Sequence, residues 1–162
     1  MLSFVRAETE HLVELAYYVR ELRVLSLTDL GSRLTRELGG VRLFFPRTLA
    51  SVLKHLETFS ENSRVYFICI VALLRTERQR PRDVDFCLLF RLHLKLYEGQ
   101  DLHADALCGL CELAPRDFNR LELQLLLRRH FNLVVPTSLF VQTCKLILDR
   151  EADTKYEVRA KM

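Results

Sequence analysis

The stretch that decides the fold is APRDFNRLELQLLLRRHFNLVVPTSLF, residues 114–140. Pro115 suits the first turn of a helix, where its missing N–H costs nothing. Apolar side chains then recur at helical spacing, at Phe118, Leu121, Leu125 and Leu126. Basic and amide side chains occupy the opposite side. This pattern predicts an amphipathic helix from Pro115 to about His130.

Glu122 interrupts the apolar side of this predicted helix. It stands four residues after Phe118 and three before Leu125, in the middle of the apolar stripe. A carboxylate that is buried alone among leucines is costly, so we expect it to have a partner. The pattern leaves open whether that partner lies inside the fold or on another protein.

Composition limits the class of protein. The chain has 162 residues, which suggests one domain that can bury a proper core, and 49% of them are hydrophobic, as in globular proteins. The net charge of +3 is too small to indicate the concentrated basic face of a nucleic-acid-binding protein, so we expect no nucleic-acid partner. Glycine, proline and hairpin signals are few, which argues against strands and favours an all-α fold.

No targeting or membrane signal is visible. The first residues, MLSFVRAETEH, include Glu8 and lack the apolar core of a signal peptide. The longest apolar run, residues 65–74, is far shorter than the ~20 residues that span a bilayer. The five cysteines are odd in number and show no framework spacing, which agrees with a reducing compartment. We therefore expect an intracellular protein, cytoplasmic or nuclear, with no membrane partner.

Apolar periodicity and capping residues predict further helices. They are expected at about 9–24, at 27–38 after a Ser26 cap, at 47–59, at 63–75, at 84–97 after an Asp83 cap, at 102–112 after an Asp101 cap, and from Pro136 to about Leu148. Glycine is expected to end two of them, at Gly39-Gly40 and at Gly99. The charged residues 149–162 are expected to fray.

The helices at 63–75 and 84–97 are apolar nearly all round, so we expect them at the centre of the bundle. The end of the second, RLHLKLY (residues 91–97), alternates like a strand. It continues a helical apolar block that is longer than a usual strand, which favours helix.

No motif indicates an enzyme. Cys108 and Cys111 form a C-x-x-C, which can be a redox pair or half of a zinc site. The βαβ context of a redox motif and the second pair of a zinc site are both missing, so core-facing cysteines are the preferred interpretation. The histidines make no metal-ligand pattern, and no glycine-rich loop could cradle a phosphate. We therefore predict no enzymatic activity, no cofactor and no metal.

Lys95 is the second charged residue of interest. It lies near the C-terminal end of a hydrophobic helix, where a cation complements the helix dipole. Arg91 stands one turn before it and Glu98 nearly one turn after it. The simplest interpretation is a lysine whose stem covers the core and whose charge pairs with Glu98. The alternative is a contact with another protein.

Several segments resemble a cyclin box. The segment FNRLEL (118–123) contains the Asn-Arg-Leu-Glu typical of PHO-type cyclins, also called P- or U-type. The segment HFNLVVPT (130–137) resembles the turn that follows in cyclins generally, and LKLYE (94–98) takes the place of their lysine-containing segment. The resemblance covers about residues 46–140.

This resemblance implies a fold and a partner. The fold would be a single cyclin-box-like five-helix bundle at 46–135, with a helical extension at 1–45 and a C-terminal helix and tail at 136–162. Cyclins bind and activate cyclin-dependent kinases, which implies a heterodimer with such a kinase. The family's kinase-binding lysine and glutamate fall on Lys95 and Glu122, and its apolar contacts fall on Leu126, Phe131 and Leu133.

Two points remain open at the level of sequence. Many cyclins carry an acidic residue before the arginine of the second box helix, where it makes a buried ion pair. That position is Leu74 here, so the ion pair must be missing or rebuilt. The alternative function is a helical interaction or scaffold module that binds no kinase, in which Glu122 would belong to an internal ion pair.

Overall fold

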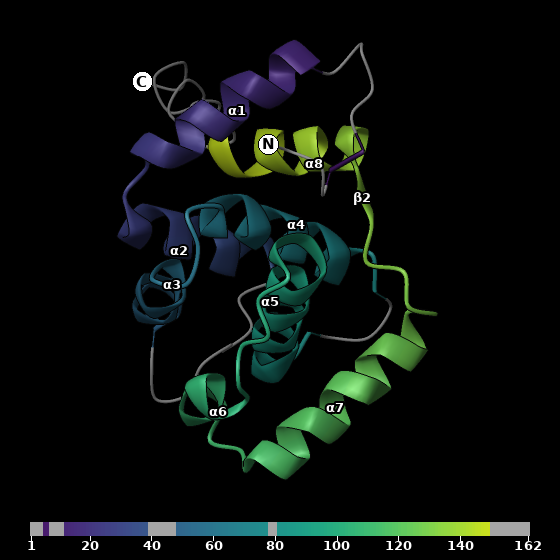
Figure 1. Cartoon of the computed structure of the whole chain (residues 1–162). Helices are drawn as coiled ribbons and strands as arrows, with labels where there is room; N and C mark the ends of the chain where they lie inside the picture. The colour runs from purple at the N-terminus through teal and green to yellow at the C-terminus, as the bar shows by residue number, and fades with distance from the viewer. Residues whose placement is uncertain (1–4, 7–11, 39–47, 78–80, 150–162) are drawn as a thin grey trace.

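The computed structural model describes residues 5–6, 12–38, 48–77 and 81–149. These ranges contain eight α-helices, which confirms the predicted, mostly helical fold (Figure 1). The helices are α1 (Leu12–Val24), α2 (Leu27–Glu37), α3 (Leu49–Glu57), α4 (Ser63–Arg75), α5 (Asp83–Glu98), α6 (Asp105–Cys111), α7 (Pro115–Arg128) and α8 (Thr137–Cys144). A wider π-helical turn, Lys145–Asp149, continues α8.

Helix α4 forms the centre of the molecule. Every residue from Val65 to Leu74 is buried, because α1, α3, α5 and α8 pack around it. In Figure 1, α4 crosses the middle of the view, with α1 and α8 above it and α5 below it. Helix α5 is buried along most of its length, from Val84 to Leu94. The expected position of these two helices is therefore confirmed, since a helix that is apolar all round needs cover on every side.

Helices α2 and α3 pack closely against each other. The Ser26 cap is confirmed, because its Oγ accepts a hydrogen bond from the backbone N–H of Asp29 at 3.1 Å. Between the helices, Gly31 approaches Ala50 so closely that a Cβ at position 31 would lie 3.0 Å from the Ala50 backbone nitrogen and Cα. Glycine at position 31 is therefore a requirement of helix packing.

Two predicted caps are wrong. Asp83 is the first residue of α5, and Arg82 precedes the helix, with its backbone N–H donating to Asp85 Oδ2 at 3.0 Å. Helix α6 begins at Asp105, later than the Asp101 cap predicted, and the Asp105 N–H donates to Nδ1 of His103 at 3.3 Å. In both places the hydrogen bond at the start of the helix is accepted by a side chain other than the predicted aspartate, by Asp85 at α5 and by His103 at α6.

The first and last described residues lie at opposite ends of α8. A two-residue strand, β1 (Val5–Arg6), pairs in parallel with β2 (Val135–Pro136), and such short strands carry no periodicity that could predict them. Helix α8 starts directly after Pro136, one residue later than expected. The hydroxyl of Tyr18 on α1 donates to Asp149 Oδ2 at 2.8 Å, which ties α1 to the π-helical turn.

One hydrophobic core extends through α1 to α8. Residues before 45 and after 135 contribute to it, and the division of the chain at these two positions remains a prediction. The first residues of the expected first and third helices, the expected Gly39-Gly40 stop and the expected frayed tail after Asp149 lie outside the described ranges. None of the helices described combines the length and the apolar character that crossing a membrane requires.

His93 is a buried titratable group on α5. Its Nδ1 lies 2.7 Å from the carbonyl oxygen of Leu89, and the rings of Tyr66 and Tyr97 pack against it. Its Nε2 is buried and has no hydrogen-bond partner among the described residues. Burial lowers the pKa of His93 from its ordinary 6.5 to about 4, because a charged imidazolium would lose its hydration.

We expect Gly31→Ala to lower the free energy of unfolding by about 1–2 kcal/mol, because the cost of overpacking exceeds the gain in helix propensity. Gly109, which has no atom within 4 Å of its Cβ position, is the matched control. Gly109→Ala should raise stability by about 0.5–1 kcal/mol. Urea denaturation of both variants tests the pair, and a stabilised Gly31→Ala would contradict the close packing.

We expect His93 to make the fold sensitive to acid. Between pH 6.5 and about 4, His93 is protonated in the unfolded chain and neutral in the folded chain, so the free energy of unfolding falls as the pH falls. Below that pH window the loss of unfolding free energy reaches about 3 kcal/mol. Above the window His93 is neutral in both states, so it adds no pH dependence. Urea denaturation across this range should show a flatter profile for His93→Leu. Parallel profiles for wild type and variant would rule out the effect.

Candidate protein-binding site

Helix α7 lies at the edge of the molecule and packs against α5 and α6 (Figure 1). It begins at Pro115, as predicted. Only Phe118 and Leu125 are fully buried in it, whereas Leu121 and Leu126 are half-buried. The predicted apolar stripe is thus only partly buried, and much of the surface of α7 is exposed to solvent.

The partner of Glu122 lies inside the fold. Nη1 of Arg91, on α5, stands 3.3 Å from Oε2 of Glu122, and both side chains are largely buried. Arg91 also donates from Nε to the carbonyl oxygen of Leu102 at 2.8 Å and from Nη1 to Oδ1 of Asn119 at 2.7 Å. Arg91 therefore joins α5, α7 and the segment between them, a role that the sequence analysis did not assign to it.

The ion pair leaves Glu122 incompletely satisfied. Its Oε2 is buried and accepts no hydrogen bond from the described residues, because the hydrogen bonds of Arg91 go elsewhere. Burial raises the pKa of Glu122, and the opposing effects of Arg91 and then Lys95 do not cancel the rise. In the folded chain the ionised carboxylate is therefore less stable than it would be in water.

Lys95 is exposed on α5 and forms no ion pair within the described ranges. The suggested pairing with Glu98 is wrong, because the Glu98 carboxylate accepts hydrogen bonds from the hydroxyls of Ser60 and Tyr66. The charge of Lys95 acts on the carboxylate of Glu122 across the packed helices α5 and α7. The lysine and the glutamate are thus brought within electrostatic reach of each other.

The three apolar residues of the predicted site differ in exposure. Phe131 is 63% exposed, in the turn after α7, where its backbone is left-handed with a φ of 58°. Leu126 is half-buried on α7. Leu133 is only 5% exposed, so it supports the turn from within and presents little surface to a partner. Phe131 is the most accessible apolar group among the three.

Further exposed apolar side chains were not predicted. Leu123 and Leu127 lie one turn apart on α7 and are 54% and 56% exposed, and Leu96 is also exposed, next to Lys95. The i, i+4 spacing of Leu123 and Leu127 could have revealed a second apolar stripe. Large apolar side chains that stay uncovered near one another are typical of protein–protein contacts.

An ion-pair network holds the end of α7 in place. Nη1 of Arg129 stands 3.0 Å from Glu77, and Nη2 of Arg128 stands 3.3 Å from Glu77 and 3.8 Å from Asp85. Glu77 follows α4, and Asp85 lies in the first turn of α5. Leu74, which stands where many cyclins carry an acidic residue, is buried. Three residues later Glu77 forms ion pairs with Arg128 and Arg129.

Cys108 and Cys111 of the C-x-x-C are free thiols on α6. Cys108 is buried and Cys111 half-buried on α6, and neither is in a disulfide bond. Burial raises the pKa of Cys108, which disfavours the reactive thiolate. Within the described ranges, no group of histidine, cysteine, aspartate and glutamate side chains is arranged to hold a metal ion.

Arg91→Met and Glu122→Gln should have opposite consequences. Arg91→Met should lower the free energy of unfolding by about 2 kcal/mol, because Glu122 loses its ion-pair partner and Asn119 and the Leu102 carbonyl lose their hydrogen-bond donor. Glu122→Gln should leave stability unchanged or slightly higher, because it removes a charge whose burial is unfavourable. Urea denaturation at neutral pH measures both values.

Arg116→Met on the exposed side of α7 is the matched control and should change stability by less than about 0.5 kcal/mol. A loss of about 3–5 kcal/mol in Glu122→Gln would show that the ion pair is needed for folding. That result would contradict the conclusion that the Glu122 charge is held at a cost.

Comparison of the chain with family models, with curated proteins and with solved structures finds no match in any of the three.

Proposed function

We propose that this chain is a cyclin-type regulatory subunit that binds and allosterically activates a cyclin-dependent kinase. The observation that carries the proposal is the state of Glu122. Its carboxylate remains on α7 although burial raises its pKa and its Oε2 lacks a hydrogen bond. A residue that costs stability is usually retained for function.

The charges at this site could be completed by a second helix. Lys95 is exposed and could donate to a carboxylate or to the carbonyl groups at a helix C-terminus, whereas the carboxylate of Glu122 is largely buried beside Arg91 and would act on a bound helix through its negative charge. Their opposite signs on adjacent helices would fix the register and direction of a bound helix. The same two positions carry the kinase-binding lysine and glutamate in the cyclin resemblance, which supports the proposal independently.

Apolar contacts would supply most of the affinity. Phe131 and Leu96 are exposed, and half-buried Leu126 lies one turn after Glu122 on α7. An aromatic and two leucines on the same two-helix unit as Lys95 and Glu122 have the composition of a binding hot spot with a polar rim. Leu133 keeps the turn that presents Phe131 in place.

Activation requires a rigid binding face. Arg91 joins α5 to α7, and the ion pairs of Arg128 and Arg129 with Glu77 join α7 to the end of α4. A face fixed in this way could hold the regulatory helix of a kinase in its active position. The kinase could then keep its own lysine–glutamate ion pair and free its activation loop.

The internal contact between Arg91 and Glu122 favours the second candidate function. A helical interaction module that binds no kinase would place Glu122 in such an ion pair. The exposed leucines of α7 would then bind another class of protein. The two candidates differ in partner, so a direct binding measurement separates them.

We expect the purified chain to bind at least one member of a panel of purified cyclin-dependent kinases and to raise its phosphorylation of a peptide substrate. Lys95→Ala, Glu122→Ala and Phe131→Ala should each weaken binding by about tenfold or more, because each removes a central contact. Calorimetric titration measures affinity, and circular dichroism checks that the helices remain.

Lys54→Ala on α3 and Glu112→Ala directly after α6, both at exposed positions, are the charge-matched controls and should bind as wild type does. If no kinase of the panel binds, or if all three site variants bind normally, the kinase proposal fails. Binding without a rise in phosphorylation would reduce the proposal to docking.

A further inference from the structure

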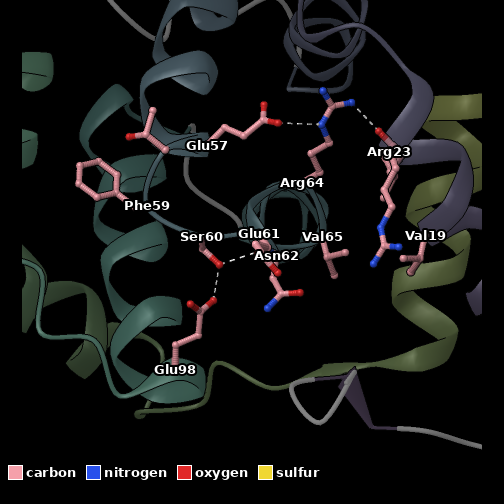
Figure 2. A pocket seen from close by; sticks show the side chains of 12 residues that line it. Val19, Arg23, Glu57, Phe59, Ser60, Glu61, Asn62, Arg64, Val65 and Glu98 are labelled. Atoms are coloured by element: carbon pink, nitrogen blue, oxygen red, sulfur yellow. Dashed lines mark hydrogen bonds and ion pairs between the residues drawn. The ribbon is translucent and has the colours of Figure 1, made fainter.

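A groove lies between α1, the turn that joins α3 to α4, and the end of α5 (Figure 2). Its volume is about 1010 Å³, and it shares no residue with the proposed kinase site. Apolar side chains, including Val19, Phe59 and Val65, line it together with charged ones. Neither the fold nor the proposed function accounts for this combination.

The backbone makes the groove electronegative. Three helices end at it, α1 at Val24, α3 at Glu57 and α5 at Glu98, whereas only α4 begins there. A helix C-terminus carries a partial negative charge, and an acidic residue in the last turn is unfavourable. Glu57 and Glu98 nevertheless occupy the last positions of their helices, so dipoles and carboxylates reinforce each other.

The groove already binds one guanidinium group, which belongs to the chain itself. Nη1 of Arg64 donates to the carbonyl oxygens of Leu22, at 2.6 Å, and Leu25, at the end of α1. Its Nε lies 3.5 Å from Oε1 of Glu57, as Figure 2 shows. The chemistry of this surface is thus suited to arginine.

Acceptors remain after Arg64 is bound. Oε2 of Glu57 is buried and accepts no hydrogen bond from any described residue. Glu61 is exposed in the turn before α4, and Glu98 is hydrogen-bonded to Ser60 and Tyr66. Arg23 is the second cation that lines the groove. Three carboxylates, Glu57, Glu61 and Glu98, therefore face two guanidinium groups.

We infer that this groove binds an extended protein segment in which an arginine stands beside an aliphatic residue. The guanidinium would bind the exposed carboxylate of Glu61 and would also be attracted by the negative charge of Glu57, and the aliphatic side chain would pack against half-buried Phe59. Because α1 forms one wall, the region before residue 45 would take part in choosing the partner. The inference does not depend on kinase binding.

Fluorescence anisotropy with the full chain tests the groove directly. The probe is a short fluorescein-labelled peptide of repeated Gly-Arg-Ile, and its counterpart is repeated Gly-Glu-Ile. At low ionic strength the arginine peptide should bind about tenfold or more tightly than the glutamate peptide, and added salt should weaken it. Glu61→Lys and Glu57→Gln should each weaken binding of the arginine peptide by about fivefold or more.

Glu112→Lys, at the exposed residue directly after α6, is the charge-matched control, and Lys95→Ala separates this groove from the kinase site. Both should bind the arginine peptide as wild type does, and thermal melting should confirm that every variant is folded. Equal affinity for the two peptides, or unchanged binding in Glu61→Lys and Glu57→Gln, would overturn the inference. A preference for the glutamate peptide would overturn it too, because Arg23 would then define the ligand.

Discussion

The burial of α4 on every side is the constraint on which the architecture depends. From Val65 to Leu74 no position faces solvent, so a complete ring of helices is needed to exclude water from it. Helices α1, α3, α5 and α8 supply that ring. Helix α7 packs on α5 and α6 at the edge, where its apolar side chains are only partly covered. Exposed apolar side chains therefore occur on α7 and in the segment after it, and a second set, which includes Val13 and Val24, occurs on α1.

The site on α5 and α7 combines order with local instability. Arg91 and the ion pairs around Glu77 hold the two helices in a fixed relation, yet Glu122 remains an unfavourable charge between them. A rigid surface with unsatisfied groups loses little entropy when a partner binds and gains the contacts that it lacks. In the groove beside α1, Oε2 of Glu57 is likewise buried and accepts no hydrogen bond from the described residues.

Local features of the fold could be predicted from sequence, and contacts between distant segments could not. Ser63 and Arg75 were correct bounds for α4, because a long apolar run between polar turns leaves little choice. The Asp101 cap failed because α6 begins only at Asp105, whose N–H donates to His103. Arg91 and Glu122 are 31 positions apart by their numbering, so only the packing of α5 on α7 could reveal their contact. The groove is assembled from three helix ends and has no motif in the sequence.

The bond between Tyr18 and Asp149 has a consequence for how the chain is made. The two residues are 131 positions apart, and α1 packs mainly on α4 and α8. During synthesis α1 leaves the ribosome long before α8 exists, so its buried face, which includes Leu15, Val19 and Leu22, can pack only on α4 until α8 has been made. Final closure of the core on this side therefore waits for α8 and the π-helical turn after it.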